Sequence, residues 1–393
     1  MASLLILPFP PTPYSRAVLE AAYRPPLVAV LKKLLQSDNK VASVLTVVVP
    51  GPFLSGPPYG EKTLVWSTAQ ALLAHVYSIT ALICAKENVE ADVRVVLVDH
   101  VRGRSFDTDA MWSFRENGTA VFDLRAFAHS FYPFATLYRV NTEAGIDVFN
   151  TYLQLIESKY LLKQDQIVTV EGGLGLSVRQ EVPRQSGDGE TFSTVCIGGT
   201  FDHLHEGHKL LLSAGVLLLR LPRDGRAKLV IGITGDEMLK SKKFAELIEP
   251  WSARAHGVVS FLASLLDTRE MRGKHIDALD VVKEETPGTL TASFRAGAVS
   301  VQCVTIQDGF GPTVTCEDMQ ALVVSGETRA GGTAVNAKRA EQGWHALKIY
   351  EVDVLDAREQ NGGVDGEEVK EAEDYSAKIS STAIRQRWAQ RSG

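Results

Sequence analysis

A twelve-residue turn in the second half of the chain, GGTFDHLHEGHK at positions 198–209, constrains the fold more than any other segment. The apolar run before it predicts a buried strand, its two glycines a tight turn, and the apolar run after it a helix. His205 and His208 therefore lie where a strand passes into a helix, and the N–H groups of a helix N-terminus bind phosphate. Two imidazoles at this place can add hydrogen bonds and positive charge for phosphoryl oxygens, as transfer of a nucleotide requires.

Length and composition set the broad class. The chain has 393 residues, of which 45% are hydrophobic and 22% charged, so two or three globular domains are expected. The formal net charge of -6 argues against a nucleic-acid binder that relies on bulk charge. The most apolar helical stretch, residues 72–85, is too short to cross a bilayer, so no membrane span is expected.

The cysteines indicate the compartment. Four of them are widely spaced along the chain: Cys84, Cys196, Cys303 and Cys316. This spacing fits reduced thiols in an intracellular protein better than a disulfide framework, and a cytoplasmic location is expected.

The first block, residues 1–182, has the pattern of an α/β domain whose role the sequence does not reveal. Residues 43–49 and 93–98 predict strands, and residues 67–87 and 151–162 predict helices. The polar segment 183–190 predicts a linker.

The second block, residues 191–393, alternates strands and helices. Strands are predicted at residues 194–197, 228–233, 301–306, 321–324 and 346–352. The alternation predicts a Rossmann-like, doubly wound parallel sheet. Residues 284–297 are expected to form a loop insertion and the acidic residues 356–374 a disordered one. No internal repeat is apparent.

A second motif, KISSTAIR at 378–385, lies near the end of this block. Ser380, Ser381 and Thr382 can cap a helix and leave N–H groups and hydroxyls for an anion. Arg385, about one turn further on, can lend donors to the same phosphates. Taken alone, the segment could equally be a capped helix with a surface arginine.

Together, the two motifs resemble the HxGH and ISSTxxR signatures of the nucleotidyltransferase superfamily. Segments between them, AELIEPWSAR (245–254), DGFGPT (308–313), ALVVSGETR (321–329) and GGTAVNAKR (331–339), resemble the eukaryotic phosphopantetheine adenylyltransferases in family order. The first block resembles, more loosely, the domain that precedes this enzyme in animal coenzyme A synthase. Animal coenzyme A synthase also has a kinase domain with a P-loop. This sequence contains no GxxxxGK[ST] loop, so we expect a separate enzyme to phosphorylate the dephospho-coenzyme A that the resemblance implies as the product.

The resemblance implies transfer of AMP from ATP, with Mg²⁺, to 4′-phosphopantetheine, which gives dephospho-coenzyme A and pyrophosphate. Other coenzyme A enzymes are candidate partners. Catalysis is assigned to His205, His208, Lys242 and Arg385. ATP binding is assigned to Gly199, Thr200, Phe201, His205, His208, Ser325, Glu327, Thr328, Asn336, Ser380, Ser381 and Thr382. Acceptor binding is assigned to Thr200, Asp202, His203, Lys242 and Arg254.

Several of these assignments have alternatives. Lys240 and Lys243 compete with Lys242 for the basic position between the two phosphates. Arg254 could be a charge partner or an ordinary surface arginine. The polar residues 325–336 could form a strand-end loop without ligand contact.

Other functions were weighed against this one. The spacing HxHxxH at residues 203–208 permits a zinc site, but no further carboxylate is evident and the distant serines would be left unexplained, so no metal ligand is predicted. A cytidylyltransferase or a nicotinamide-mononucleotide adenylyltransferase would keep the class. However, the residues before the serines and the LIEP and SGET segments do not resemble those families. A scaffold that has lost catalysis finds no support in the intact motifs.

Two glycine-rich segments of the first block imitate nucleotide loops. Residues 56–63 have the spacing GxxxGxKT, which is not that of a P-loop, and residues 172–177 precede strand-like sequence. Both are predicted to be ordinary loops. Because the family motifs form one continuous block, deletion of residues 1–185 is expected to leave measurable transfer.

Overall fold

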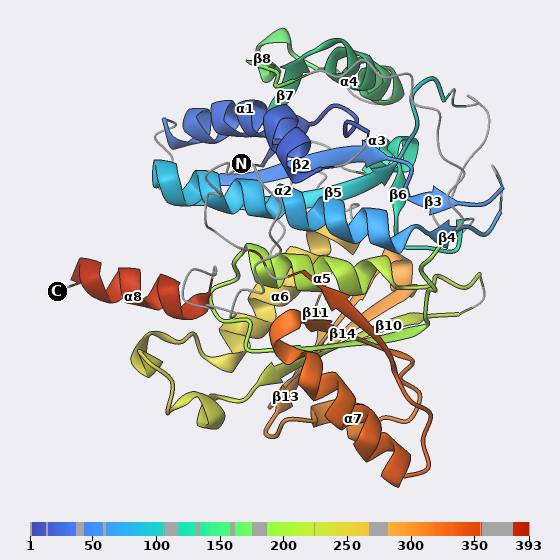
Figure 1. Cartoon of the computed structure of the whole chain (residues 1–393), viewed down its shortest axis with the longest axis vertical. Helices are drawn as coiled ribbons and strands as arrows, with labels where there is room; N and C mark the ends of the chain where they lie inside the picture. Colours follow the sequence, from blue (N-terminus) through green and yellow to red (C-terminus); the bar gives the residue numbers. More distant parts are fainter. Residues whose placement is uncertain are drawn as a thin grey trace, which may run out of the picture.

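The computed structural model describes residues 2–12, 15–36, 43–57, 60–104, 106, 117–130, 134–157, 162–174, 187–223, 225–266, 282–353, 355 and 380–392. Two open α/β sheets, one in each half of the chain, stack with helices between them (Figure 1).

The first half forms a parallel sheet. Its elements are β1 (Ser3–Ile6), α1 (Arg16–Leu35), β2 (Ser43–Gly51), β3 (Leu54–Ser55), β4 (Thr63–Leu64), α2 (Trp66–Glu87), β5 (Ala91–Asp99), β6 (Phe122–Asp123), α3 (Leu124–Ser130), β7 (Thr136–Asn141), α4 (Glu143–Glu157) and β8 (Ile167–Glu171). Six strands pair in the order β6-β5-β2-β1-β7-β8, all parallel. Strands β3 and β4 form a separate hairpin.

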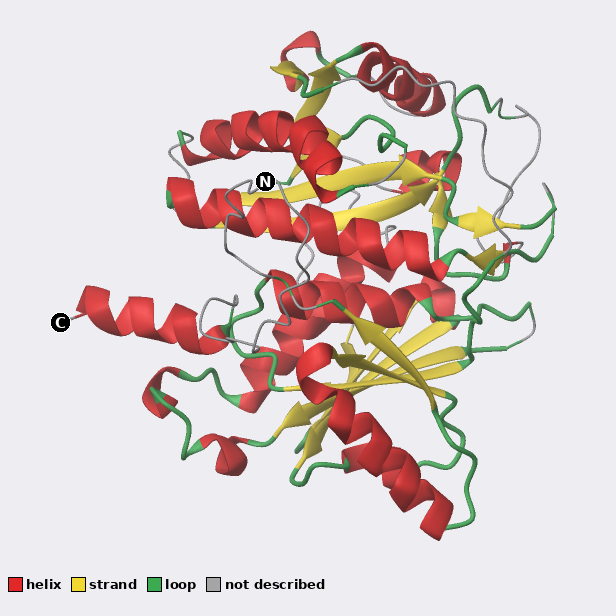
Figure 2. Ribbon diagram, in the orientation of Figure 1, coloured by secondary structure: helices red, strands yellow, loops and turns green. Residues whose placement is uncertain are grey.

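The second half forms a mixed sheet of seven strands. Its elements are β9 (Thr194–Gly199), α5 (Glu206–Leu217), β10 (Ala227–Thr234), α6 (Trp251–Leu266), β11 (Val282–Thr286), β12 (Thr289–Phe294), β13 (Val299–Ile306), β14 (Ala321–Ser325), α7 (Arg329–Glu341), β15 (Lys348–Val352) and α8 (Ser381–Ser392). The order is β11-β12-β13-β10-β9-β14-β15. The five strands β13, β10, β9, β14 and β15 pair in parallel, whereas β12 pairs antiparallel with both of its neighbours, β11 and β13. Helices cover both faces of this sheet (Figure 2).

The two sheets share one topology. The central order β5-β2-β1-β7-β8 of the first sheet matches β13-β10-β9-β14-β15 of the second, strand for strand along the chain. The sequence gives no sign of this repeat, because a buried strand requires only an apolar run, which many sequences supply. In such sheets, ligands bind at the carboxyl ends of the strands, beside the first strand.

All five strands predicted for the second half are confirmed, and the predicted loop at residues 284–297 is wrong. Most of that segment is a hairpin, β11 and β12, in which buried and half-buried residues alternate along β12. This alternation is the period of a strand. Of the predicted linker, residues 187–190 are described and tied to both halves, since Asp188 accepts a hydrogen bond from Ser67 N and Glu190 pairs with Lys348. The acidic segment 356–374 lies outside the described residues.

Helix α2 confirms the helix predicted at residues 67–87 and extends beyond the apolar stretch 72–85 on which the expectation of no membrane span was based. Its 22 residues make it long and apolar enough to cross a membrane by length and composition alone, but 67% of the tested window is buried inside the protein. It is therefore accounted for as a core helix.

The halves meet through packed helices and a shared core. Helix α2 of the first half lies against α5 of the second (Figure 1). One continuous apolar cluster runs through both halves. Arg295, only 2% exposed, extends from the second sheet and donates to the carbonyl of Ala120 at 2.7 Å, with its guanidinium over the Phe122 ring.

The glycines at 172–173 have a packing role. Pro25 and Pro26 lie inside α1 and lack the N–H groups that the carbonyls of Ala21 and Ala22 would otherwise receive. The chain after β8 crosses this place, and Leu174 N donates to the Ala21 carbonyl at 3.0 Å. A Cβ on Gly173 would collide with both carbonyl oxygens.

We expect Gly173→Ala to lower the free energy of unfolding by about 2 kcal/mol, because backbone on both sides must shift to admit the methyl group. Urea unfolding would measure this change. Gly309→Ala is the control, since a Cβ there meets nothing within 4 Å, and its effect should stay within about 0.5 kcal/mol. Equal effects of the two substitutions would contradict this account of the α1 crossing.

Candidate active site

The two sequence motifs line one cavity of about 760 Å³. It lies at the carboxyl ends of the central strands of the second sheet. The first motif contributes Gly198, Gly199, Thr200, His205 and His208, and the second contributes Ser380, Ser381, Thr382 and Arg385. Segments far apart in the sequence therefore share a cleft at the place where doubly wound sheets bind ligands.

The two histidines form a stacked pair at the start of α5. Their ring centroids are 3.9 Å apart, and His205 has the extended backbone of a helix N-cap. Each Nδ1 is buried and has no hydrogen-bond partner in the described part of the chain. Burial, with the charge of Lys209, lowers the pKa of His205 to about 4, and burial also lowers the pKa of His208. Both rings are therefore neutral near pH 7, and the expected positive charge must come from other groups.

The turn between β9 and α5 is tightly wound. Phe201 and His203 both have positive φ, at 52° and 46°, a region that non-glycine residues seldom adopt. Phe201 is fully buried and packs against His208, and His203 donates from Nε2 to the carbonyl of Leu247 at 2.9 Å. Neither residue lines the cavity, although both were assigned to binding. They shape the turn that carries the histidines.

An ion pair joins the two motifs. Asp202 and Arg385, 183 residues apart in the sequence, are paired with both side chains almost fully buried. Ser381 adds a hydrogen bond from its Oγ to the Asp202 carbonyl at 2.8 Å. Asp202 does not line the cavity, so the structure gives it a partner in Arg385 in place of direct access to substrate.

Lys242 is the lysine that reaches the cavity. Its Nζ lies 3.1 Å from Thr200 Oγ1, and burial followed by the charge of Arg385 lowers its pKa. Lys240 is exposed and pairs with Glu237, and Lys243 offers its carbonyl to Arg385. Lys242 is thus placed to meet an anion beside the histidines.

Arg254 braces the backbone around the cavity. It is 1% exposed and donates to the carbonyls of Glu249, Thr200 and Thr234 and to Asp236. It does not line the cavity. Of the two alternatives, Arg254 is a charge partner, of Asp236, and not a surface arginine.

Polar residues after β14 divide into two groups. Ser325, Glu327 and Thr328 line the cavity, and the Ser325 and Thr328 side chains form a reciprocal cap. Asn336 lies elsewhere, where its amide both donates to and accepts from the backbone of Leu347, at 2.9 and 2.8 Å. Asn336 therefore fastens α7 to the strand that follows it.

The sequence assignments omitted the wall formed by the segment after β13. Asp308, Phe310 and Thr313 line the cavity there, with Met238 nearby. The N–H groups of Gly311 and Phe310 lower the pKa of Asp308. The signal was available, because the DGFGPT segment directly follows a predicted strand.

A group of possible metal ligands lies next to the cavity. Asp202, His203 and Glu249 place one ligand atom each within 4.8 Å of one another. Asp202 is already engaged by Arg385, and Glu249 accepts from the backbone N–H of His203 at 2.9 Å. These internal bonds account for the cluster without an ion.

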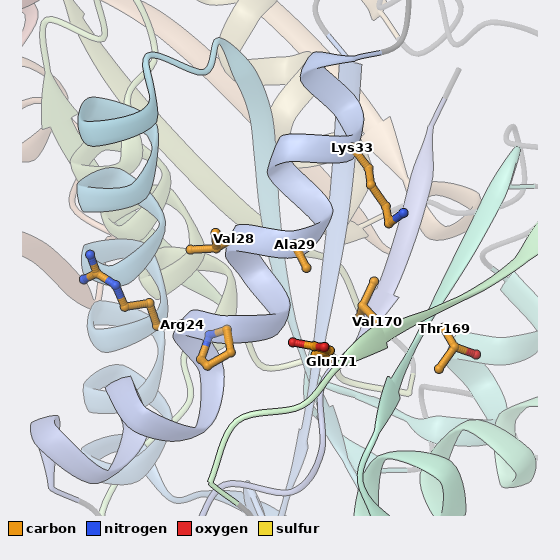
Figure 3. Close-up of a pocket in the computed structure, with 8 residues that line it drawn as sticks. Arg24, Val28, Ala29, Lys33, Thr169, Val170 and Glu171 are labelled. Carbon is orange, nitrogen blue, oxygen red and sulfur yellow. The ribbon is translucent and has the colours of Figure 1, made fainter.

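A second hollow, of about 540 Å³, lies between α1 and β8 in the first half (Figure 3). Arg24, Lys33 and Glu171 are its charged residues, and the remaining lining is mostly aliphatic. No residue of either motif lines it, and Arg24 is paired with Glu20. The cavity beside the histidines is therefore the candidate active site.

A doubly wound sheet with histidines at its first strand-to-helix turn and serines opposite them places the chain among the nucleotidyltransferases. Sequence similarity to known proteins supports this class. "Phosphopantetheine adenylyltransferase" of Saccharomyces cerevisiae is 33% identical over 50% of this chain and 49% of its own length. The protein of that name from Methanothermobacter thermautotrophicus is 30% identical over 42% of this chain and 76% of its own. The chain belongs to the phosphopantetheine adenylyltransferase family.

The chain is also similar to a second fungal protein, and its first half matches a separate family. An uncharacterized protein of Schizosaccharomyces pombe is 34% identical over 49% of this chain and 47% of its own length, so the chain spans about half the length of these fungal relatives. Residues 1–176 match a family described as "Domain of unknown function (DUF8446)".

We expect the free energy of unfolding to fall as the pH drops from about 6.5 to about 4. In that window the unfolded chain binds a proton that folded His205 excludes, because its folded pKa lies below its unfolded one. His205→Gln should remove about 2 kcal/mol of this loss in the free energy of unfolding. This is less than the full pKa difference implies, because the residue keeps some exposure to solvent, which weakens the shift. Urea unfolding at several pH values measures it. Identical slopes for the wild type and His205→Gln would refute the assignment.

Proposed function

We propose that the protein transfers AMP from ATP to 4′-phosphopantetheine, giving dephospho-coenzyme A and pyrophosphate. The observation that carries the proposal is the pair of buried, unpartnered Nδ1 atoms at a helix N-terminus, in a cavity whose other lining includes the serines at 380–381. Two imidazoles beside the N–H groups of a helix N-terminus favour a ligand with strong acceptor oxygens.

In this reaction, a phosphate oxygen of the acceptor forms a bond to the α-phosphorus of ATP. The bond from that phosphorus to the bridging oxygen breaks, and pyrophosphate leaves with the electron pair. No protein nucleophile is needed, so catalysis depends on alignment and on stabilising the charge that develops.

The histidines act as neutral donors. Their low pKa values keep one N–H on each ring at neutral pH, and that N–H can donate to an α-phosphoryl oxygen. The free N–H groups of the first turn of α5 add to this site. Lys242 supplies the positive charge between donor and acceptor phosphates.

The second motif would hold the leaving end. Ser380, Thr382 and the start of α8 line the same cavity. The two hydroxyls accept from Ala383 N and Arg385 Nη2 and can still donate their own protons to the β- and γ-phosphates. Arg385 would fix the turn through Asp202 and present its remaining edge to the phosphates. Ser325, Glu327 and Thr328 would line the nucleoside side.

Mg²⁺ would enter with ATP, because triphosphate oxygens supply most of its ligands in such sites. When bound, it neutralises charge on the leaving pyrophosphate. The carboxylates of Asp308 and Glu327, both in the cavity lining, are oxygen donors of the kind it prefers.

The substrate is tested by following pyrophosphate release from purified protein. The acceptors 4′-phosphopantetheine, nicotinamide mononucleotide and phosphocholine are offered separately, each with ATP and with CTP. Release only with 4′-phosphopantetheine and ATP supports the proposal. Release with another pair would replace it with that transferase activity.

We expect His208→Ala to lower kcat by on the order of 100-fold while changing ATP affinity much less, because its hydrogen bond should strengthen as the phosphoryl group is transferred. Pyrophosphate release gives kcat and calorimetric titration gives the ATP Kd. Equal losses in both would contradict a role in the transition state.

We expect Lys242→Met to lower kcat by on the order of 100-fold, because it removes the cationic group beside the reacting phosphates. Lys240→Met is the matched control, since that lysine is exposed and pairs with Glu237, and its kcat should stay near the wild-type value. A similar loss in the control would place the effect in the whole segment and not in Lys242.

A further inference from the structure

A network of one buried and two partly buried charges joins the first sheet to the helix that carries the histidines. Lys209, the residue after His208, is 4% exposed and forms an ion pair with Asp92 at 2.9 Å. Asp92 belongs to β5 in the other half of the chain. The second carboxylate oxygen of Asp92 accepts two hydrogen bonds from Arg94, at 2.9 and 2.6 Å.

Arg94 extends the network to a second helix. Its Nη1 donates to the carbonyl of Ser260, in α6, at 3.2 Å. Asp92 and Arg94, both in β5, thus bind α5 and α6 respectively, the two helices on this face of the second sheet. The contacts cross the boundary where the sequence suggested separable domains.

Asp92 is held in its ionised form by its two cationic partners. Burial alone would raise the pKa of Asp92, but the charges of Lys209 and Arg94 outweigh it and lower that pKa. The carboxylate is therefore ionised. Because Lys209 is almost fully buried, removing the Asp92 carboxylate leaves its ammonium without this partner, which is more costly than losing a surface pair.

The geometry connects the network to the chemistry. Lys209 lies in the first turn of α5, and its backbone N–H donates to the carbonyl of His205 at 3.0 Å. A movement of this turn therefore displaces His205 and His208 together. Misplacement of reacting groups by about 1 Å can lower a rate by on the order of 100-fold.

We propose that Asp92 is a positioning residue for the histidine turn, so that the first half of the chain is an integral support of the active site. The proposal rests on the proposed function for its kinetic test. It replaces the expectation that residues 1–185 are dispensable, because their removal would strip Lys209 and Arg295 of partners that the first half supplies.

The test uses the full chain with Asp92→Asn. We expect hydrogen–deuterium exchange in the first turn of α5 to rise by about tenfold or more, and kcat to fall by on the order of 100-fold with a smaller change in KM. Asp92→Glu keeps the charge and should restore most of kcat. Lys209→Met, which leaves Asp92 paired with Arg94, should reproduce the loss and serves if Asp92→Asn does not fold.

The matched control is Asp99→Asn, at the other end of the same strand. Asp99 also forms a buried ion pair, with Lys62 at 3.2 Å, but within the first half alone. It should lower the melting temperature while leaving exchange in α5 and kcat within about twofold of wild type. Equal effects of the two variants on kcat, or no effect of Asp92→Asn on α5, would overturn the proposal.

The two proposals can fail separately. If the wild-type protein transfers no nucleotide to 4′-phosphopantetheine, the proposed function fails. Exchange in the first turn of α5 still decides whether Asp92 positions it, because that measurement requires no substrate.

Discussion

The active site depends on the ion pair between Asp202 and Arg385. Asp202 lies in the turn after the first strand of the second sheet and Arg385 in the last described helix, so the pair joins the beginning and the end of this half beside the cavity. Because both side chains are buried, loss of either would leave a charge without a partner. The histidines on one side and the serines on the other owe their common cavity to this contact.

In the cavity, the histidines can provide hydrogen bonds without charge, and a lysine provides the positive charge. Burial keeps both imidazoles neutral, so they can donate without repelling each other at a ring separation of 3.9 Å. The positive charge is left to Lys242, whose Nζ lies 3.1 Å from Thr200 Oγ1 in the turn that carries the histidines and whose flexible stem would follow a bound phosphate group. A bound triphosphate would raise the pKa of both histidines and strengthen their hydrogen bonds as negative charge accumulates.

The sequence predicted backbone features well and side-chain direction less well. Apolar runs located the five parallel strands of the second sheet, and the glycine and serine motifs located the cavity, because both signals reside in the backbone. Arg254 was assigned to acceptor binding and Asn336 to ATP binding because both lie in segments that resemble the family. Spacing alone does not reveal whether such a residue faces a ligand or a nearby carbonyl, and both of these face backbone.

The two sheets share one topology, but different residues follow their first strands. After β9 the chain presents histidines and free N–H groups, whereas after β1 it runs through prolines that have none. The carboxyl edge of the first sheet is packed with rings, His100 lying 5.6 Å from Phe9 and 5.5 Å from Phe106. At the opposite end of β5, Asp92 forms an ion pair with Lys209 of the helix that carries the histidines, and through this contact we propose that the first half supports the active site.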